Sequence, residues 1–144
     1  MADILIASDD PALVKDIEAS LGGPDATLRV VSAGQDVLAE VRADPPELVV
    51  LDLQIGNMGG MATCMNLRLE TSGGRIEHVP VLMLLDRRPD VFLARRSGAE
   101  GWLIKPIDPI RLRRAARTLL EGGEYQDPTA APVPILSRAA GAVG

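Results

Sequence analysis

The stretch Leu48-Val49-Val50-Leu51-Asp52 decides the fold. Four consecutive apolar residues predict a strand that is covered on both faces, which is typical of parallel sheets. Similar runs occur at Ile4-Leu5-Ile6-Ala7, at Val81-Leu82-Met83-Leu84-Leu85 and at Trp102-Leu103-Ile104. Each run therefore predicts a short strand, and the run over 48–51 also places the carboxylate of Asp52 at the end of its strand.

Helical patterns separate these runs. Asp10 before Pro11 is a typical N-cap and first-turn pair, and Gly22 stands where that helix is expected to end. A second capping pair, Asp108-Pro109, precedes apolar residues at i, i+3, i+4 and i+7, which are Leu112, Ala115, Ala116 and Leu119. Both patterns predict amphipathic helices that pack one face against the sheet.

Weaker patterns complete the chain. Residues 27–32 alternate as a half-covered edge strand does, and helices are predicted over 34–43, 61–71 and 89–98. In the helix over 61–71 we expect four residues to point inward, namely Met61, Cys64, Met65 and Leu69.

Five strand-helix units in sequence predict an α/β fold with a doubly wound parallel sheet and right-handed crossovers. In such folds the site lies at the carboxyl ends of the strands, where the strand order reverses. Asp9, Asp52, Asp86 and Lys105 follow or end four of the predicted strands. We therefore expect three acids and a lysine to converge on one crevice.

Length and composition narrow the class of protein. The chain has 144 residues, of which 47% are hydrophobic, and this suits one domain with an aliphatic core. A single cysteine and a single histidine exclude an internal disulfide and a multi-histidine metal site. The apolar runs are far shorter than the roughly 20 residues of a membrane span. The sequence predicts a cytoplasmic protein without membrane insertion, and its net charge of −5 argues against nucleic acid as a partner.

The composition changes after Glu121. Residues 122–144 are rich in proline, alanine and glycine, which predicts a tail without regular secondary structure. The expected organisation is therefore a folded domain over 1–121 and a C-terminal tail over 122–144 that docks on a partner.

Taken in order, these segments resemble the receiver domain of bacterial two-component response regulators, the CheY-like module, over about residues 3 to 121. The spacing of Gly59-Gly60 and Lys105-Pro106 supports the resemblance. It implies a flavodoxin-like (βα)5 fold with the sheet order 2-1-3-4-5. No output domain follows in this sequence, so the resemblance is to a stand-alone receiver.

The resemblance also implies roles for the crevice residues. Asp52 matches the aspartate that accepts a phosphoryl group, and Lys105 matches the lysine that pairs with that group. A Mg²⁺ ion is implied next to them, held by Asp9, Asp52 and the backbone of Gln54, with Asp86 as a further candidate ligand. Carboxylates and carbonyl oxygens are the ligands that Mg²⁺ prefers.

Several positions depart from the family pattern. Ser8 stands where the first of two adjacent acids is usual, which predicts a weakened Mg²⁺ site. An alignment shifted by one residue would pair Asp9 with Asp10, but it would take Asp10 away from its capping role, so we prefer the first alignment. Leu85 occupies the switch position of a threonine or serine, and Trp102 that of the switch aromatic residue.

These departures favour an atypical receiver that is not an enzyme and that acts as a protein-interaction or accessory subunit, largely independent of phosphorylation. The resemblance suggests respiratory NADH–quinone oxidoreductase (complex I) as the larger assembly, which would place the protein at the periphery of a membrane complex. The alternative is a phosphorelay receiver that takes its phosphoryl group from a histidine kinase onto Asp52 and signals by protein binding.

Arginines concentrate on the last two predicted helices. A face that docks an acidic protein partner is one interpretation, and an ordinary solvated helical face is the other. The candidate docking residues are Arg95, Arg96, Arg111, Arg113, Arg114 and Arg117.

Overall fold

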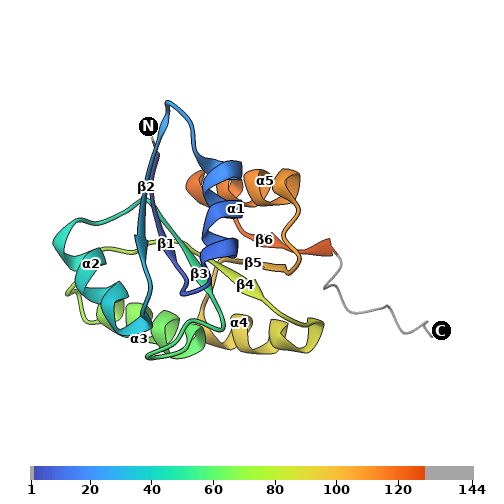
Figure 1. Ribbon diagram of the computed structural model, residues 1–144. Coiled ribbons are helices and arrows are strands. Elements are labelled where there is room, and N and C mark those ends of the chain that lie inside the picture. Colours follow the sequence, from blue (N-terminus) through green and yellow to red (C-terminus); the bar gives the residue numbers. More distant parts are fainter. Residues whose placement is uncertain (1, 129–144) are drawn as a thin grey trace.

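The computed structural model describes residues 2–128, which form a six-stranded parallel sheet between two layers of helices (Figure 1). The strand order is β2-β1-β3-β4-β5-β6. This confirms the predicted α/β flavodoxin-like fold and its order 2-1-3-4-5, and it adds one strand outside β5. The strands are β1 (Ala2–Ala7), β2 (Ala26–Val31), β3 (Leu48–Asp52), β4 (Val81–Leu85), β5 (Gly101–Ile104) and β6 (Tyr125–Gln126).

Helices cover both faces of the sheet. Helices α1 and α5 lie on one face, and α2, α3 and α4 lie on the other (Figure 1). Their bounds are α1 (Pro11–Leu21), α2 (Val37–Ala43), α3 (Gly60–Ser72), α4 (Val91–Ser97) and α5 (Pro109–Leu120). Short 3₁₀ turns precede two of them, at η1 (Gly34–Asp36) and η2 (Arg88–Asp90).

Alternation along the buried strands divides the core into two halves. In β3, Leu48 and Val50 pack with α1 and α5, whereas Val49 and Leu51 pack in the half that α2, α3 and α4 cover. Successive side chains of a strand point to opposite faces, so a run that is apolar throughout can fill both halves. The run that predicted a strand covered on both faces is therefore buried as expected.

The strongest helix predictions are confirmed. The side chain of Asp10 accepts hydrogen bonds from the backbone N–H groups of Ala12 and Leu13, and this caps α1. Gly22 follows the last residue of α1 as expected, and its backbone N–H donates to the carbonyl of Glu18. All four apolar positions that were expected to face inward on α5 are buried.

The expected orientation of α3 is partly wrong. Cys64 is fully buried as predicted, but the side chains of Met65 and Leu69 are exposed, and Leu67 is buried in their place. This helix carries apolar residues on two faces, so its pattern alone does not say which face meets the sheet. The contacts with the sheet and with α4 select the face of Cys64 and Leu67.

The predicted boundary at residue 121 also needs correction. Tyr125 and Gln126 form β6, which pairs in parallel with β5, and Asp127 behind it is buried. Two paired residues carry no recognisable strand pattern, so the composition of this segment concealed the strand. The rest of the expected docking tail, residues 129–144, lies outside the described residues. Among the helices described, none is long and apolar enough to cross a membrane.

Candidate functional site

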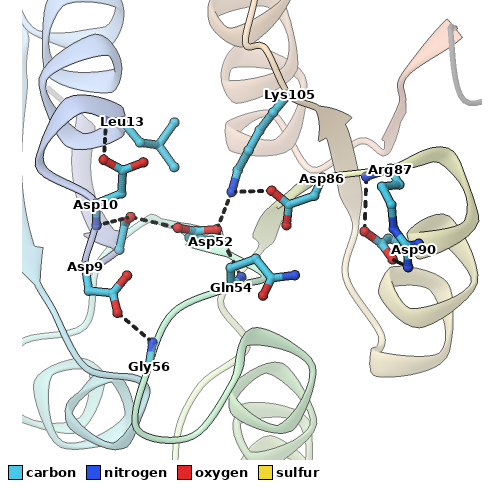
Figure 2. A network of polar contacts seen from close by, with 11 residues as sticks. Asp9, Asp10, Leu13, Asp52, Gln54, Gly56, Asp86, Arg87, Asp90 and Lys105 are labelled. Atoms are coloured by element: carbon cyan, nitrogen blue, oxygen red, sulfur yellow. Dashed lines mark hydrogen bonds and ion pairs between the residues drawn. The ribbon is translucent and has the colours of Figure 1, made fainter.

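The crevice lies at the carboxyl ends of β1, β3, β4 and β5, with Asp52 at its centre (Figure 2). Asp52 ends β3 and is only 2% exposed. Lys105, directly after β5, places its Nζ atom 2.7 Å from Oδ1 of Asp52 and 3.1 Å from Oδ1 of Asp86. The structure therefore brings together two of the predicted acids and the predicted lysine.

The remaining hydrogen bonds of Asp52 come from two neighbouring segments. The hydroxyl of Ser8 donates to Oδ2 of Asp52 at 2.8 Å, and the backbone N–H of Gln54 donates to Oδ1 at 3.1 Å. Ser8 is itself buried, and its Oγ accepts the backbone N–H of Asp10. Both carboxylate oxygens of Asp52 are thus hydrogen-bonded within the chain.

Lys105 is held by two carboxylates of different burial. Partial burial lowers the pKa of Lys105, but hydrogen bonds and charge interactions with Asp52 and Asp86 outweigh it, so that its pKa is raised above the ordinary value. The ammonium group is therefore charged throughout the neutral range, and it offsets part of the negative charge in the crevice.

Asp9 and Asp10 have separate tasks in this structure. Asp10 turns toward α1 and caps it, whereas Oδ2 of Asp9 accepts the backbone N–H of Gly56 at 3.0 Å in the loop after β3 (Figure 2). The capping role of Asp10 is confirmed, and the assignment of Ser8 and Asp9 to the acid positions stays a prediction. The shifted alignment would require Asp10 to leave the N-terminus of α1.

The predicted ligands fit a Mg²⁺ ion poorly as they lie here. Within residues 2–128, no group of three or more His, Cys, Asp or Glu side chains is placed to hold a metal ion. Asp9 is bonded to the Gly56 backbone, and Asp86 is paired with Lys105. Asp9, Asp52 and the carbonyl of Gln54 leave a sparse donor set, so Mg²⁺ at this crevice stays a prediction.

The two switch positions lie in the core on the α4 side of the sheet. Leu85 is fully buried at the end of β4, and its side chain carries no hydroxyl that could reach the crevice. Trp102 of β5 is 5% exposed, and the guanidinium carbon of Arg95 lies 5.5 Å from the centroid of its ring. Both side chains therefore contribute packing in this structure.

The candidate docking arginines do not form one uniform surface. Arg95 and Arg96 are exposed on α4, where Arg96 lies over the ring of Phe92 at 5.3 Å. Arg111 on α5 is partly buried and lies 3.5 Å from Asp127. The three that remain on α5, all exposed, are Arg113, Arg114 and Arg117.

Sequence reasoning missed Asp127. Its Oδ2 accepts the backbone N–H of Ile104 at 2.8 Å, immediately before the crevice lysine. A lone aspartate in a segment rich in proline and glycine carries no signal of this contact, which depends on β6 reaching β5.

Comparison with known protein families places these features in context. The family model described as "Response regulator receiver domain" matches residues 4–117. The DNA-binding response regulator MtrA of Mycolicibacterium smegmatis is 33% identical over 123 residues, which are 84% of this chain and 51% of that protein. The transcriptional regulatory protein AfsQ1 of Streptomyces coelicolor is 28% identical, over 88% of this chain and 54% of that protein. The chain therefore spans about half the length of these relatives.

Solved structures show the same fold. A putative response regulator from Chloroflexus aurantiacus superposes with a TM-score of 0.76 and 22% identity, over 83% of this chain and 98% of that one. The chemotaxis response regulator CheY4 of Vibrio cholerae gives a TM-score of 0.72 and 21% identity, over 81% and 97% of the two chains. At these identities the likeness concerns the fold alone.

Proposed function

We propose that this chain, which belongs to the response regulator receiver family, is a protein-interaction receiver. Its binding to a partner does not depend on phosphorylation of Asp52. The observation that carries this proposal is the state of Asp52. Its carboxylate is almost fully buried, and Ser8 and Gln54 hydrogen-bond one oxygen each. A carboxylate in this state is a poor nucleophile, because attack requires an oxygen that is free to approach phosphorus.

The charges around Asp52 support the same proposal. A phosphoryl group on Asp52 would bring additional negative charge next to Asp86, which already shares the Lys105 ammonium. Repulsion between like charges is strong where water is partly excluded. Leu85 offers no hydroxyl to a phosphoryl oxygen, so the bound group would also lack a hydrogen-bond donor at the end of β4.

Mg²⁺, if it is bound by Asp9, Asp52 and the Gln54 carbonyl, would neutralise charge on phosphoryl oxygens. With Ser8 in place of an acid, this chain contributes less negative charge to such an ion. In the proposed role, partner binding therefore requires no Mg²⁺, and the protein catalyses no reaction.

The partner in this proposal is a protein with an acidic surface that docks on the exposed arginines of α4 and α5. Docking by residues 129–144 and an accessory role in the respiratory NADH–quinone oxidoreductase remain predictions from the sequence. The proteins named MtrA and AfsQ1 are regulators of about twice this length, and their roles are not transferred to this chain.

A phosphorelay receiver is the second candidate function. The contact that favours it is the ion pair of 2.7 Å between Lys105 and Asp52, since the resemblance assigns these two residues to phosphoryl acceptance. In this account a histidine kinase would supply the phosphoryl group, and the hydrogen bond from Ser8 would have to break before transfer.

Intact mass spectrometry separates the two candidates. The protein is incubated with acetyl phosphate and Mg²⁺ at neutral pH and measured promptly. We expect no added phosphoryl group on the wild type, whereas the triple variant Ser8→Asp, Leu85→Thr, Asp86→Ala should gain one. Addition of one group to the wild type, absent in Asp52→Asn, would show that Asp52 accepts a phosphoryl group, and this would favour the phosphorelay receiver over the proposal.

A further inference from the structure

Helix α3 exposes an apolar stripe that the fold does not use. Met65 and Leu69 stand one turn apart and are 48% and 63% exposed, and Met61, one turn earlier, is only partly buried. Residues four apart on a helix lie above one another on the same face. A row of large apolar side chains on an exposed helix face is typical of a surface that binds another molecule.

Two hollows flank this stripe along the seam between α3 and α4. One, of about 510 Å³, is lined by residues that include Met61, Met65 and Leu93. The second, of about 310 Å³, is lined by residues that include Met65, Leu69 and Arg96. Met65 lines both hollows, and we call the two hollows together with the stripe between them the α3–α4 groove.

The charged side chains along the α3–α4 groove are mainly basic. Arg68, Arg87 and Arg96 line it, together with one acid, Asp90. Arg68 and Arg87 already pair with carboxylates of this chain. Arg96 lies over the ring of Phe92, and no ion pair joins it to an acid within residues 2–128. The groove therefore presents an apolar floor beside a cation that is available to a partner.

We propose that the α3–α4 groove binds an acidic amphipathic helix of a protein partner. Met61, Met65 and Leu69 would contact the apolar face of that helix, and Arg96 would pair with its carboxylates. Grooves of this kind accept helices through anchors spaced three or four residues apart, and methionine adapts its shape to such anchors. The inference rests on the proposed role as an interaction module and names the chemistry of one partner.

The position of the groove links it to the crevice. Its first hollow is also lined by Leu53 and Gln54, which directly follow Asp52. A helix bound there would touch the loop whose backbone N–H group bonds Asp52. The groove is separate from the exposed arginines of α5, which lie on the opposite face of the sheet.

Methionine methyl NMR on the full chain tests the groove directly. The chain has five methionines, so protein labelled with ¹³C at the methionine methyl groups gives few signals, assigned by single substitutions. The probe is a synthetic helical peptide of about four turns with leucines at i, i+3, i+4 and i+7 and glutamates elsewhere. We expect saturable shifts of the Met61 and Met65 signals and none at Met83, which is fully buried in β4.

Charge-matched variants locate the binding site. Met65→Glu should weaken peptide affinity at least about tenfold, because it places a charge on the apolar floor and repels the acidic peptide. Ile110→Glu introduces the same charge at a residue of α5 that is 59% exposed, and it should leave the affinity within about twofold. Arg96→Gln should weaken the acidic peptide and not a peptide with glutamine in place of glutamate.

Four results would overturn the inference. The first two are the absence of saturable shifts at Met61 and Met65, and equal binding of a peptide with lysine in place of glutamate. The others are equal losses of peptide affinity in Met65→Glu and Ile110→Glu, and shifts that follow protein concentration without peptide, which would indicate that a second copy of the chain occupies the groove. The peptide titration contains no phosphoryl donor. Failure here is therefore distinguishable from phosphoryl uptake at Asp52, which intact mass reports separately.

Discussion

Asp127 accepts a hydrogen bond from the backbone N–H of Ile104, with 2.8 Å between Oδ2 and N. The carboxylate is 2% exposed and also lies 3.5 Å from Nη1 of Arg111. The hydrogen bond joins the segment after α5 to the last residue of β5. Ile104 directly precedes Lys105, so the same bond helps to position the crevice lysine. The folded domain therefore continues past α5 to include β6 and Asp127.

Replacing Asp127 tests this contact. Asp127→Ala removes the acceptor of the Ile104 N–H group, and the loss of a buried hydrogen bond to a charged group costs about 1–3 kcal/mol. We expect that reduction in the free energy of unfolding in urea, together with faster hydrogen exchange at Ile104. Glu124→Ala, at an exposed residue of the same segment, is the control and should change stability by less than about 0.5 kcal/mol. Equal effects of the two substitutions would contradict the role of Asp127.

The different tasks of Asp9 and Asp10 give a second prediction. Asp10→Ala removes the N-cap of α1 and should lower the free energy of unfolding by about 1 kcal/mol. Asp9→Ala removes an exposed acceptor of the Gly56 N–H group, and we expect a loss of less than half as much. Thermal unfolding of both variants measures these losses. A larger loss of unfolding free energy in Asp9→Ala than in Asp10→Ala would favour the shifted alignment.

The ion pairs of Lys105 predict a pH dependence. Because its pKa in the folded state is raised above the ordinary value of 10.5, its contribution to stability is complete below that pH and is lost as the pH rises through the folded pKa. Lys105→Met should cost about 1–3 kcal/mol at neutral pH, since it leaves the buried Asp52 without a cation. The difference between wild type and variant should shrink above pH 10.5 in urea unfolding measurements. A difference that grows with pH in this range would contradict the assignment.

A close approach at Gly34 gives a fourth prediction. A Cβ atom there would lie 1.7 Å from the carbonyl oxygen of Met58, in the loop between β3 and α3. Gly34→Ala must therefore displace this loop, and we expect a loss of at least about 2 kcal/mol. Gly23→Ala is the matched control, because a Cβ atom at Gly23 meets nothing within 4 Å. Chemical denaturation of both variants checks the prediction, and a small loss at Gly34 would show that the loop yields freely.

Local patterns account for most of what the sequence could predict. The continuous apolar run of β3, the cap at Asp10 and the spacing of apolar residues on α5 each depend on neighbours within a few residues. Such patterns predict the elements, and the order of the elements then places Asp52, Asp86 and Lys105 at one end of the sheet.

Features that depend on distant segments could not be predicted in this way. The bond from Ser8 to Asp52 joins residues 44 positions apart, and it requires β1 and β3 to be neighbours with a particular register. The burial of Asp127 requires β6 to reach β5. The exposed stripe on α3 arises because that helix carries two apolar faces and the sheet takes only one of them.

The proposed function requires that Ser8, Gln54 and Lys105 hold Asp52 in place and that Asp52 does not accept a phosphoryl group. The most direct test follows the fluorescence of Trp102, the single tryptophan, during titration with beryllofluoride in the presence of Mg²⁺. We predict no saturable change in the wild type and a saturable change in the triple variant Ser8→Asp, Leu85→Thr, Asp86→Ala. A saturable wild-type response that requires Mg²⁺ and disappears in Asp52→Asn would contradict the account.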